Sequence, residues 1–213
     1  MCNDYEQHIR YAEYCKMMQD LALGIPTRQS EGDLPRVSDI KIGDTAPVMR
    51  TAGDNIAELA QMKFGFPPPR NGGPVFNFRS EGRRFGSSHR CLIPATAFFE
   101  FTGKKHPKTK HRFSFAGAPF MAIAGIWRAG EGNQPPAFSM LTTEPGPDVE
   151  PFHNRQVAVL QPNDWKAWID LTKREEELLR PLPAGSLKVE TVCKDQTEWH
   201  TVRPDPMRTE GRQ

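Results

Sequence analysis

No hydrophobic run in the sequence approaches the roughly 20 residues that a membrane-spanning helix requires. The chain begins Met1-Cys2-Asn3-Asp4, and this polar, acidic start lacks the basic residues and apolar core of a secretion signal. A large excess of either charge is also lacking, because 28 Lys and Arg stand against 26 Asp and Glu, a net charge of +2. Such a balance argues against a disordered chain. We therefore expect a folded, cytoplasmic protein with no membrane partner.

Cysteine is scarce, and its four positions are far apart: Cys2, Cys15, Cys91 and Cys193. A structural zinc site needs Cys and His ligands about two to five residues apart, and no such cluster occurs. We therefore expect neither a metal nor an organic cofactor. Three of the cysteines lie among apolar neighbours, where a small buried residue is a sufficient explanation. Cys2 does not fit that explanation.

Positive charge is concentrated in one window, residues 82–112. The window holds eight Lys and Arg against Glu100 alone, a net charge of +7, so the rest of the chain carries −5. Such a concentration indicates a polyanionic partner, for example nucleic acid. The alternative is a solvated loop that happens to be rich in Lys.

The apolar pattern predicts one α+β domain over residues 1–202, followed by a flexible tail at 203–213. A length of 213 residues suits one large domain, and no repeat or linker divides the chain. Short β-type runs bounded by turn residues predict a mixed, largely antiparallel, barrel-like sheet flanked by helices. These runs lie at 75–78, 91–93, 97–101, 111–115, 120–127, 137–142 and 156–160, with candidate edge strands at 39–42 and 47–49.

Helices are predicted in three places. The first spans 4–23, with Asn3 and Glu6 as a capping box at its start. The others lie at 162–169, where Pro162 stands at the beginning, and at 172–179.

Cys2 carries unusual chemistry if Met1 is removed, because an α-amine and a thiol then share one residue. The reference pKa values are about 7.7 to 8.0 for the amine and 8.5 for the thiol, so both are partly nucleophilic at neutral pH. A position just before a helix would favour the thiolate further. Such a residue can condense with an aldehyde to a thiazolidine, or attack a carbonyl as N-terminal nucleophile hydrolases do. The alternative is an early residue with no role.

Several segments, in this order and spacing, resemble the SRAP family, the SOS-response-associated peptidase or abasic-site processing proteins. The matching segments are 77–81 (NFRSE), 90–95 (RCLIPA), 98–101 (FFEF), 124–127 (AGIW), 142–144 (TTE) and 153–155 (HNR). The resemblance implies that the N-terminal Cys forms a thiazolidine crosslink with the aldehyde of an abasic site in single-stranded DNA, which protects the lesion. It also implies removal of the initiator Met by the protein itself, and lyase-type activity.

The resemblance assigns a chemical role to four residues. Cys2 would be the nucleophile and Asn77 would orient its amine. Glu100 would shuttle protons, and its aromatic neighbours independently predict a low dielectric that raises its pKa. On a strand, however, Glu100 could equally point to solvent. His153 has a reference pKa that suits proton transfer, although a lone His in a loop usually has no role.

The DNA contacts are expected from arginines and one aromatic residue. Arg79 and Arg155 match family arginines that hold phosphates. The basic window adds three further candidates: Arg83, Arg84 and Arg90. Phe64 stands where the family commonly has Trp-Gly, and it would either stack on an exposed base or pack in the core.

The chain departs from the family pattern at its start, where Asn3 and Asp4 replace the usual Gly-Arg, so that an anion stands in place of a phosphate-binding cation. We expect a monomer that captures abasic sites in single-stranded DNA and, in a bacterium, associates with the nucleoid. Two alternatives stay open. One is an N-terminal-nucleophile amidohydrolase of the glutamine amidotransferase type, which needs a layered αββα fold. The other is a noncovalent single-strand-binding module, in which Cys2 is idle.

Overall fold

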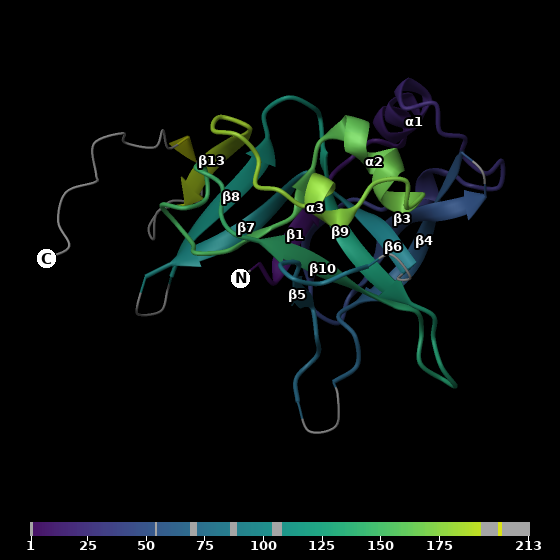
Figure 1. The fold of residues 1–213 in the computed structure, drawn as a ribbon, viewed down its shortest axis with the longest axis horizontal. Helices are drawn as coiled ribbons and strands as arrows, with labels where there is room; N and C mark the ends of the chain where they lie inside the picture. The colour runs from purple at the N-terminus through teal and green to yellow at the C-terminus, as the bar shows by residue number, and fades with distance from the viewer. Residues whose placement is uncertain are drawn as a thin grey trace, which may run out of the picture.

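The strands of the protein form two β-sheets (Figure 1), as seen in a computed structural model that describes residues 2–53, 55–68, 72–85, 89–103, 108–192 and 200–201. The first sheet has the strand order β14-β13-β8-β7-β1-β2. Its strands are β1 (Asp4–Gln7), β2 (Val37–Lys41), β7 (Ala97–Thr102), β8 (Thr109–Phe115), β13 (Leu187–Val192) and β14 (His200–Thr201). The pairs within this sheet are antiparallel.

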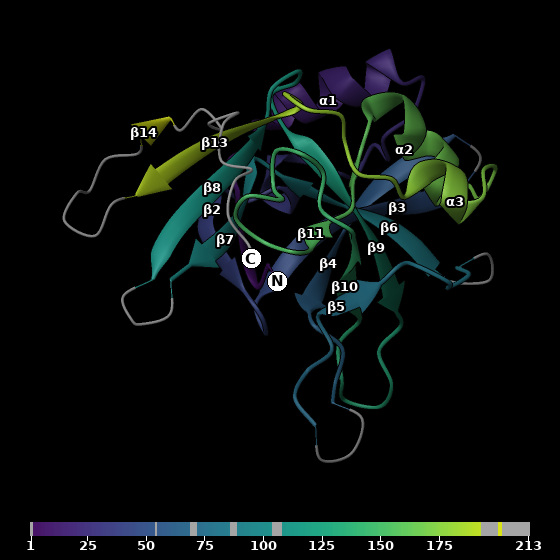
Figure 2. The same cartoon turned by 60° about the vertical axis from the view of Figure 1, so that its left-hand side comes forward.

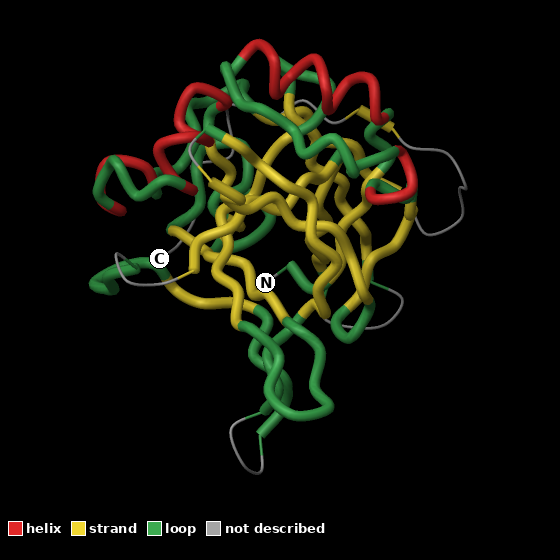
Figure 3. The backbone as a smooth tube through the Cα atoms, turned by 90° about the vertical axis from the view of Figure 1, so that its right-hand side faces the viewer, coloured by secondary structure: helices red, strands yellow, loops and turns green. Residues whose placement is uncertain are grey.

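The second sheet has the order β11-β10-β4-β3-β6-β9-β12, with β5 added beside β10. Its strands are β3 (Thr45–Gly53), β4 (Ile56–Phe64), β5 (Asn77–Arg79), β6 (His89–Ala95), β9 (Met121–Arg128), β10 (Ala137–Thr143), β11 (Gln156–Val157) and β12 (Val159–Leu160). Strand β10 also pairs with β9, so the sheet closes into a ring (Figure 3). Because β10 runs parallel to β4 and β5, the expectation of a mixed, largely antiparallel sheet in an α+β domain is confirmed.

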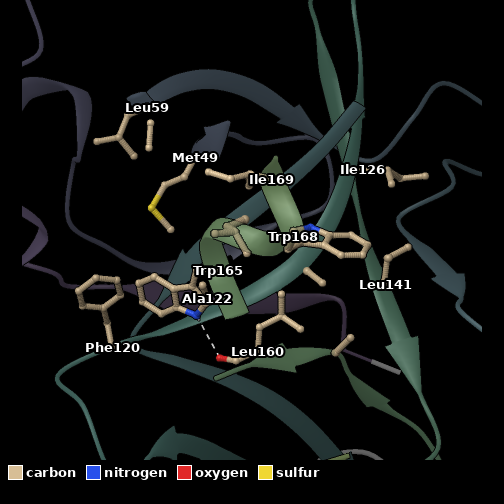
Figure 4. Packing of buried hydrophobic residues seen from close by; sticks show 14 of the residues in the cluster. Met49, Leu59, Phe120, Ala122, Ile126, Leu141, Leu160, Trp165, Trp168 and Ile169 are labelled. Atoms are coloured by element: carbon tan, nitrogen blue, oxygen red, sulfur yellow. Dashed lines mark hydrogen bonds between the residues drawn. The ribbon is translucent and has the colours of Figure 1, made fainter. Parts of the chain in front are cut away.

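Helices cover one side of the ring, as Figures 1 and 3 show, and Figure 2 gives the same arrangement from a second angle. They are α1 (Tyr11–Asp20), α2 (Pro162–Ile169) and α3 (Glu175–Leu178). Both tryptophans of α2 are buried and satisfy their indole N–H groups. Trp165 donates to the carbonyl of Leu160 at 3.1 Å (Figure 4), and Trp168 donates to the carbonyl of Cys91 at 2.9 Å. Large buried aromatic side chains of this kind each contribute about 3–5 kcal/mol to stability.

A hydrophobic cluster separate from the tryptophans of α2 joins the first sheet to residues of the ring. Tyr5 of β1 packs edge-on against Phe64 of β4, with ring centroids 5.8 Å apart, and Phe64 stacks on Phe138 at 5.1 Å. Phe98 of β7 stacks on Phe113 of β8 at 5.0 Å. This cluster includes Cys2, so the start of the chain is drawn into the interior.

The predicted helix over 4–23 is wrong over its first seven residues, about two turns. Asp4–Gln7 form strand β1, whose four residues are all buried, and Tyr5 pairs with Phe98 of β7. Helix α1 begins at Tyr11, where the Arg10 N–H donates to the Glu13 side chain at 3.0 Å, in place of the expected capping box. Tertiary pairing and burial outweigh local helix propensity here.

Other boundaries also differ from the expectations. The predicted helix at 172–179 is reduced to α3, and strands β4 and β13 were not anticipated from the apolar pattern. The expected tail at 203–213 and Cys193 lie outside the described residues. Within the described ranges, none of the helices combines the length and the hydrophobicity that spanning a membrane requires.

Candidate active site

Cys2 lies directly before β1, and its side chain is almost completely buried. The thiol donates a hydrogen bond to the carbonyl oxygen of Asp4 at 3.1 Å. The expected position before a helix is wrong, and so is the expected lowering of the thiol pKa. Burial raises the pKa of the Cys2 thiol, and the negative charge of Glu100 raises it further. The thiol is therefore protonated at neutral pH.

Asn77 begins strand β5 and pairs with Met140 of β10, which brings it beside the start of the chain. Its side-chain Nδ2 donates to the carbonyl oxygen of Cys2 at 2.8 Å. The amide thus holds the carbonyl of Cys2, whereas the sequence predicted a contact with the amine. In the part of the chain that the structure describes, Asn77 Oδ1 is buried without a hydrogen-bond partner. The Oδ1 atom is therefore, among the described residues, an acceptor without a hydrogen bond next to Cys2.

Glu100 lies on β7 two residues after Phe98, so the two side chains share the inner face of the strand. The side chain is only 2% exposed, and the solvent-facing alternative is therefore wrong. Burial raises the pKa of Glu100 to about 7, although a hydrogen bond with the backbone of Cys2 acts in the opposite direction. Near neutral pH this carboxyl can both accept and release a proton.

His153 lies across from Glu100, with its Nε2 3.8 Å from Glu100 Oε2. Burial lowers the pKa of His153, so the imidazole is neutral at pH 7. Its Nδ1 lies 3.0 Å from the backbone N–H of Arg155 and 2.9 Å from the carbonyl oxygen of the same residue. If Nδ1 accepts the N–H, Nε2 presents a proton to Glu100; if Nδ1 donates to the carbonyl, Nε2 presents a lone pair. Only the second tautomer allows proton transfer between the two side chains, because the Nε2 lone pair can take a proton from protonated Glu100 and return it.

The structure thus brings together all four residues that the sequence assigned to chemistry. Asn77 and Glu100 both contact the backbone of Cys2, and His153 faces Glu100. The first sheet supplies the residue before β1 and strand β7, which pairs with β1, and the second sheet supplies β5 and the turn before β11, which both flank β10. Packing of the two sheets against each other, and not strand pairing, brings these two halves of the site together. Among the described residues, no group of three His, Cys, Asp or Glu side chains is arranged to hold a metal ion.

The predicted DNA-contacting arginines fall into two groups. Arg79, at the end of β5, is exposed, as are Arg83 and Arg84. Arg83 and Arg84 line a cavity of about 410 Å³ together with Glu81 and Glu144. These three arginines are placed where an external phosphate can reach them.

The remaining two predicted arginines are engaged by carboxylates. Arg90 is only 2% exposed, pairs with Glu175 at 2.9 Å and lies over the ring of Trp168. The expectation that Arg90 contacts DNA is therefore contradicted, because its guanidinium is part of the core beneath α2. Arg155 contacts Glu81 with both terminal nitrogens.

Phe64 is completely buried between Tyr5 and Phe138. A ring without exposed surface cannot stack on a DNA base. The structure thus supports core packing, which was the other interpretation of this residue.

The basic window is less positive in the fold than in the sequence. Arg112 pairs with Glu6 and Glu190, and Lys110 pairs with Asp4 at 3.1 Å. The carboxylates come from β1 and β13, so only strand pairing reveals the neutralisation. The sequence analysis did not predict the pairing of Lys110 with Asp4. It also did not predict the contact of Glu81 with Arg155, and the only sequence signal for Glu81 was its place in the segment that contains Asn77 and Arg79.

The fold and the site define an α+β protein with a candidate cysteine nucleophile ahead of its first strand, beside an amide, a carboxyl and an imidazole. The chain belongs to the SOS response associated peptidase (SRAP) family, whose model matches residues 1–198. The layered αββα arrangement of the amidohydrolase alternative is not seen in the described ranges, where the second sheet closes on itself instead.

Relatives with names and structures agree with this membership. The chain is 28% identical over 155 residues to the abasic site processing protein YoqW of Bacillus subtilis, covering 63% of this chain and 69% of that one. It is 29% identical over 98 residues to the abasic site processing protein YMR114C of Saccharomyces cerevisiae, covering 44% and 27%. A phage-related protein of Bordetella bronchiseptica has the same fold in its crystal structure, with a TM-score of 0.67 at 20% identity, covering 90% and 94% of the two chains.

Proposed function

We propose that the protein processes abasic sites in DNA, by covalent capture of the lesion at Cys2 after removal of Met1. The observation that carries this proposal is the contact of Glu100 with the backbone of Cys2, next to a buried thiol. Removal of Met1 turns that backbone nitrogen into an α-amine, which then lies beside a carboxyl able to exchange protons. Family membership and the names of the relatives support the choice of abasic DNA as the substrate.

The capture proceeds by one condensation followed by one addition. The sugar of an abasic site opens to an aldehyde, and the amine of Cys2 adds to the carbonyl carbon to give a carbinolamine. Loss of one water gives an imine. The thiol then adds across the C=N bond, so that sulfur bonds to carbon and the thiol proton goes to nitrogen, which closes a five-membered thiazolidine. The net change is the loss of one water.

The protonation states of the site favour the amine as the first nucleophile. The Cys2 thiol is held protonated by burial, so it is a weak nucleophile until the imine forms. Glu100 can protonate the sugar ring oxygen and the departing hydroxyl, and it can take protons from the amine. His153 is placed to relay protons to and from Glu100. We propose the same groups for removal of Met1 and for lyase-type reversal.

Single-stranded DNA is the proposed substrate form, with Arg79, Arg83 and Arg84 as its phosphate ligands. Each is exposed, and Arg79 lies two residues from Asn77. Arg155 can join them only if a phosphate displaces Glu81 from its guanidinium. Electrostatic contacts of this kind supply affinity without selecting a base sequence.

One experiment tests the covalent step directly. The mature protein is mixed with a single-stranded oligonucleotide that carries one abasic site, denatured, and run on a gel beside Cys2→Ala and the matched control Cys15→Ala. We expect a heat-tolerant shifted band for the parent and for Cys15→Ala, and none for Cys2→Ala, which should still bind undamaged DNA. The intact mass should be lighter by one Met.

The alternatives have distinct outcomes in the same experiment. Cys2→Ser should form at most an imine, which borohydride traps as a stable amine. Salt-sensitive binding with no denaturation-resistant band would support the noncovalent module. Full crosslinking by Cys2→Ala would refute the proposal.

A further inference from the structure

Arg155 lies in the turn that carries His153, and its guanidinium is held by several hydrogen bonds. Its Nη1 and Nη2 donate to the two carboxylate oxygens of Glu81, at 2.5 and 2.9 Å. Nη2 also donates to the carbonyl and the hydroxyl oxygens of Thr142, at 2.8 and 2.9 Å. A two-pronged contact of this kind fixes the orientation of the guanidinium plane as well as its position.

These contacts tie together three segments that are distant in sequence. Glu81 follows β5, Thr142 belongs to β10, and Arg155 ends the turn before β11. Strands β5 and β11 both pair with β10, so the guanidinium reinforces a junction that backbone hydrogen bonds begin.

Arg155 also contacts His153, through its backbone rather than its side chain. The N–H and the carbonyl of Arg155 both lie within hydrogen-bond distance of His153 Nδ1. The opposite ring nitrogen of His153 faces Glu100. A displacement of Arg155 would therefore turn the imidazole away from the carboxyl.

The carboxylate of Glu81 is needed because the guanidinium is largely buried. The Arg155 side chain is 11% exposed, and in the described part of the chain its Nε has no hydrogen-bond partner. A cation in that environment needs a compensating charge, and Glu81 is the carboxylate that contacts it. Without it, the guanidinium would be driven towards water, and the turn would move with it.

We propose that Glu81 is a positioning residue of the candidate active site: by clamping Arg155 against Thr142, it holds the turn in which His153 faces Glu100. The inference rests on the proposed function for its catalytic meaning, but its structural content is independent of the substrate. Glu81 itself touches none of the reacting atoms.

A competing explanation is that Glu81 merely covers a phosphate-binding arginine and leaves when DNA arrives. The two explanations differ in what a substitution changes. If Glu81 is only a cover, its replacement raises DNA affinity and has no effect on the imidazole in the absence of DNA. A positioning residue affects the imidazole whether or not DNA is present.

The test uses Glu81→Gln, which keeps the shape but not the charge, and Glu81→Ala, which removes both. Glu144→Gln is the matched control, because Glu144 is an exposed carboxylate on the same cavity. The titration of His153 is followed by NMR of its ring Cε1–H, assigned with His153→Ala. Crosslinking rates at saturating abasic DNA and affinities for undamaged single strands are measured on the same proteins.

We expect Glu81→Ala to raise the pKa of His153 towards its ordinary value near 6.5, as the ring becomes more solvated. The crosslinking rate should fall about 10-fold or more, because small misplacements of a catalytic group reduce rates strongly. Glu81→Gln should show the same changes to a smaller extent, and Glu144→Gln should match the parent. Affinity for undamaged DNA should change by less than about 2-fold in every variant.

An unchanged His153 titration in both Glu81 variants would overturn the proposal, and so would tighter DNA binding with a steeper salt dependence and an unaltered imidazole. If the parent forms no crosslink at all, the proposed function fails, while the NMR comparison still decides whether Glu81 positions His153. Retained folding of the variants is checked by urea denaturation.

Discussion

Replacing Glu100 by Gln is expected to remove a pH-dependent loss of stability that the buried carboxyl imposes on the parent. Burial raises the pKa of Glu100 from 4.5 to about 7 in the folded protein. A group with a raised pKa binds its proton more tightly in the folded state, so its contribution to stability is fully present at low pH and is lost as the pH rises through 7. Each pKa unit corresponds to about 1.4 kcal/mol, so the loss amounts to about 3 kcal/mol.

The assay is urea denaturation of the parent and of Glu100→Gln at about pH 5 and about pH 9, between which most of this loss occurs. The parent should lose about 3 kcal/mol of unfolding free energy relative to the variant over that interval. Glu144→Gln, which replaces an exposed carboxylate, should follow the parent. The measurement depends on no DNA substrate and so tests the environment of the carboxyl by itself.

Parallel pH profiles for the parent and Glu100→Gln would refute the reasoning, because they would mean that the carboxyl titrates alike in the folded and unfolded states. The same variant should slow crosslinking by about 10²- to 10⁴-fold, the usual contribution of a general acid or base, with noncovalent DNA affinity nearly unchanged.

Three further predictions concern the other site residues. Phe64→Ala should lower the unfolding free energy by about 3–5 kcal/mol in urea titrations, because it leaves a cavity in the core, with unchanged DNA affinity of the folded fraction. Arg79→Ala should weaken binding to single strands and reduce the logarithmic salt slope by about one, whereas Arg90→Ala should leave the slope unchanged and lower stability by about 3 kcal/mol. A fluorescence titration at several salt concentrations separates the two arginines. His153→Ala should slow crosslinking to abasic DNA more than reaction with a simple open-chain aldehyde, because ring opening is the step that requires proton relay; equal slowing would contradict that role.

The sequence by itself determined the chemistry available to the protein. The aminothiol potential of Cys2 follows from residue type and position alone, and the aromatic neighbours of Glu100 already predicted its raised pKa. Most strands from residue 89 to 160 were also recognisable, since alternation and turn residues are local signals. The order and spacing of the matching segments were enough to indicate the family.

Only the tertiary structure decided how those parts are arranged. Residues 4–7 became a strand because β2 and β7 are available to pair with them, and no local pattern carries that information. Phe64 proved to be core, and Arg90 proved to be buried, because their partners come from distant strands and from the segment around α3. Contacts between residues far apart in the chain depend on which strands pair and in what register, and register is set by the packing of the whole domain. The facing of His153 and Glu100 is also a tertiary feature, since Glu100 lies in the first sheet and His153 lies beside the second, and only packing of the two sheets brings them together.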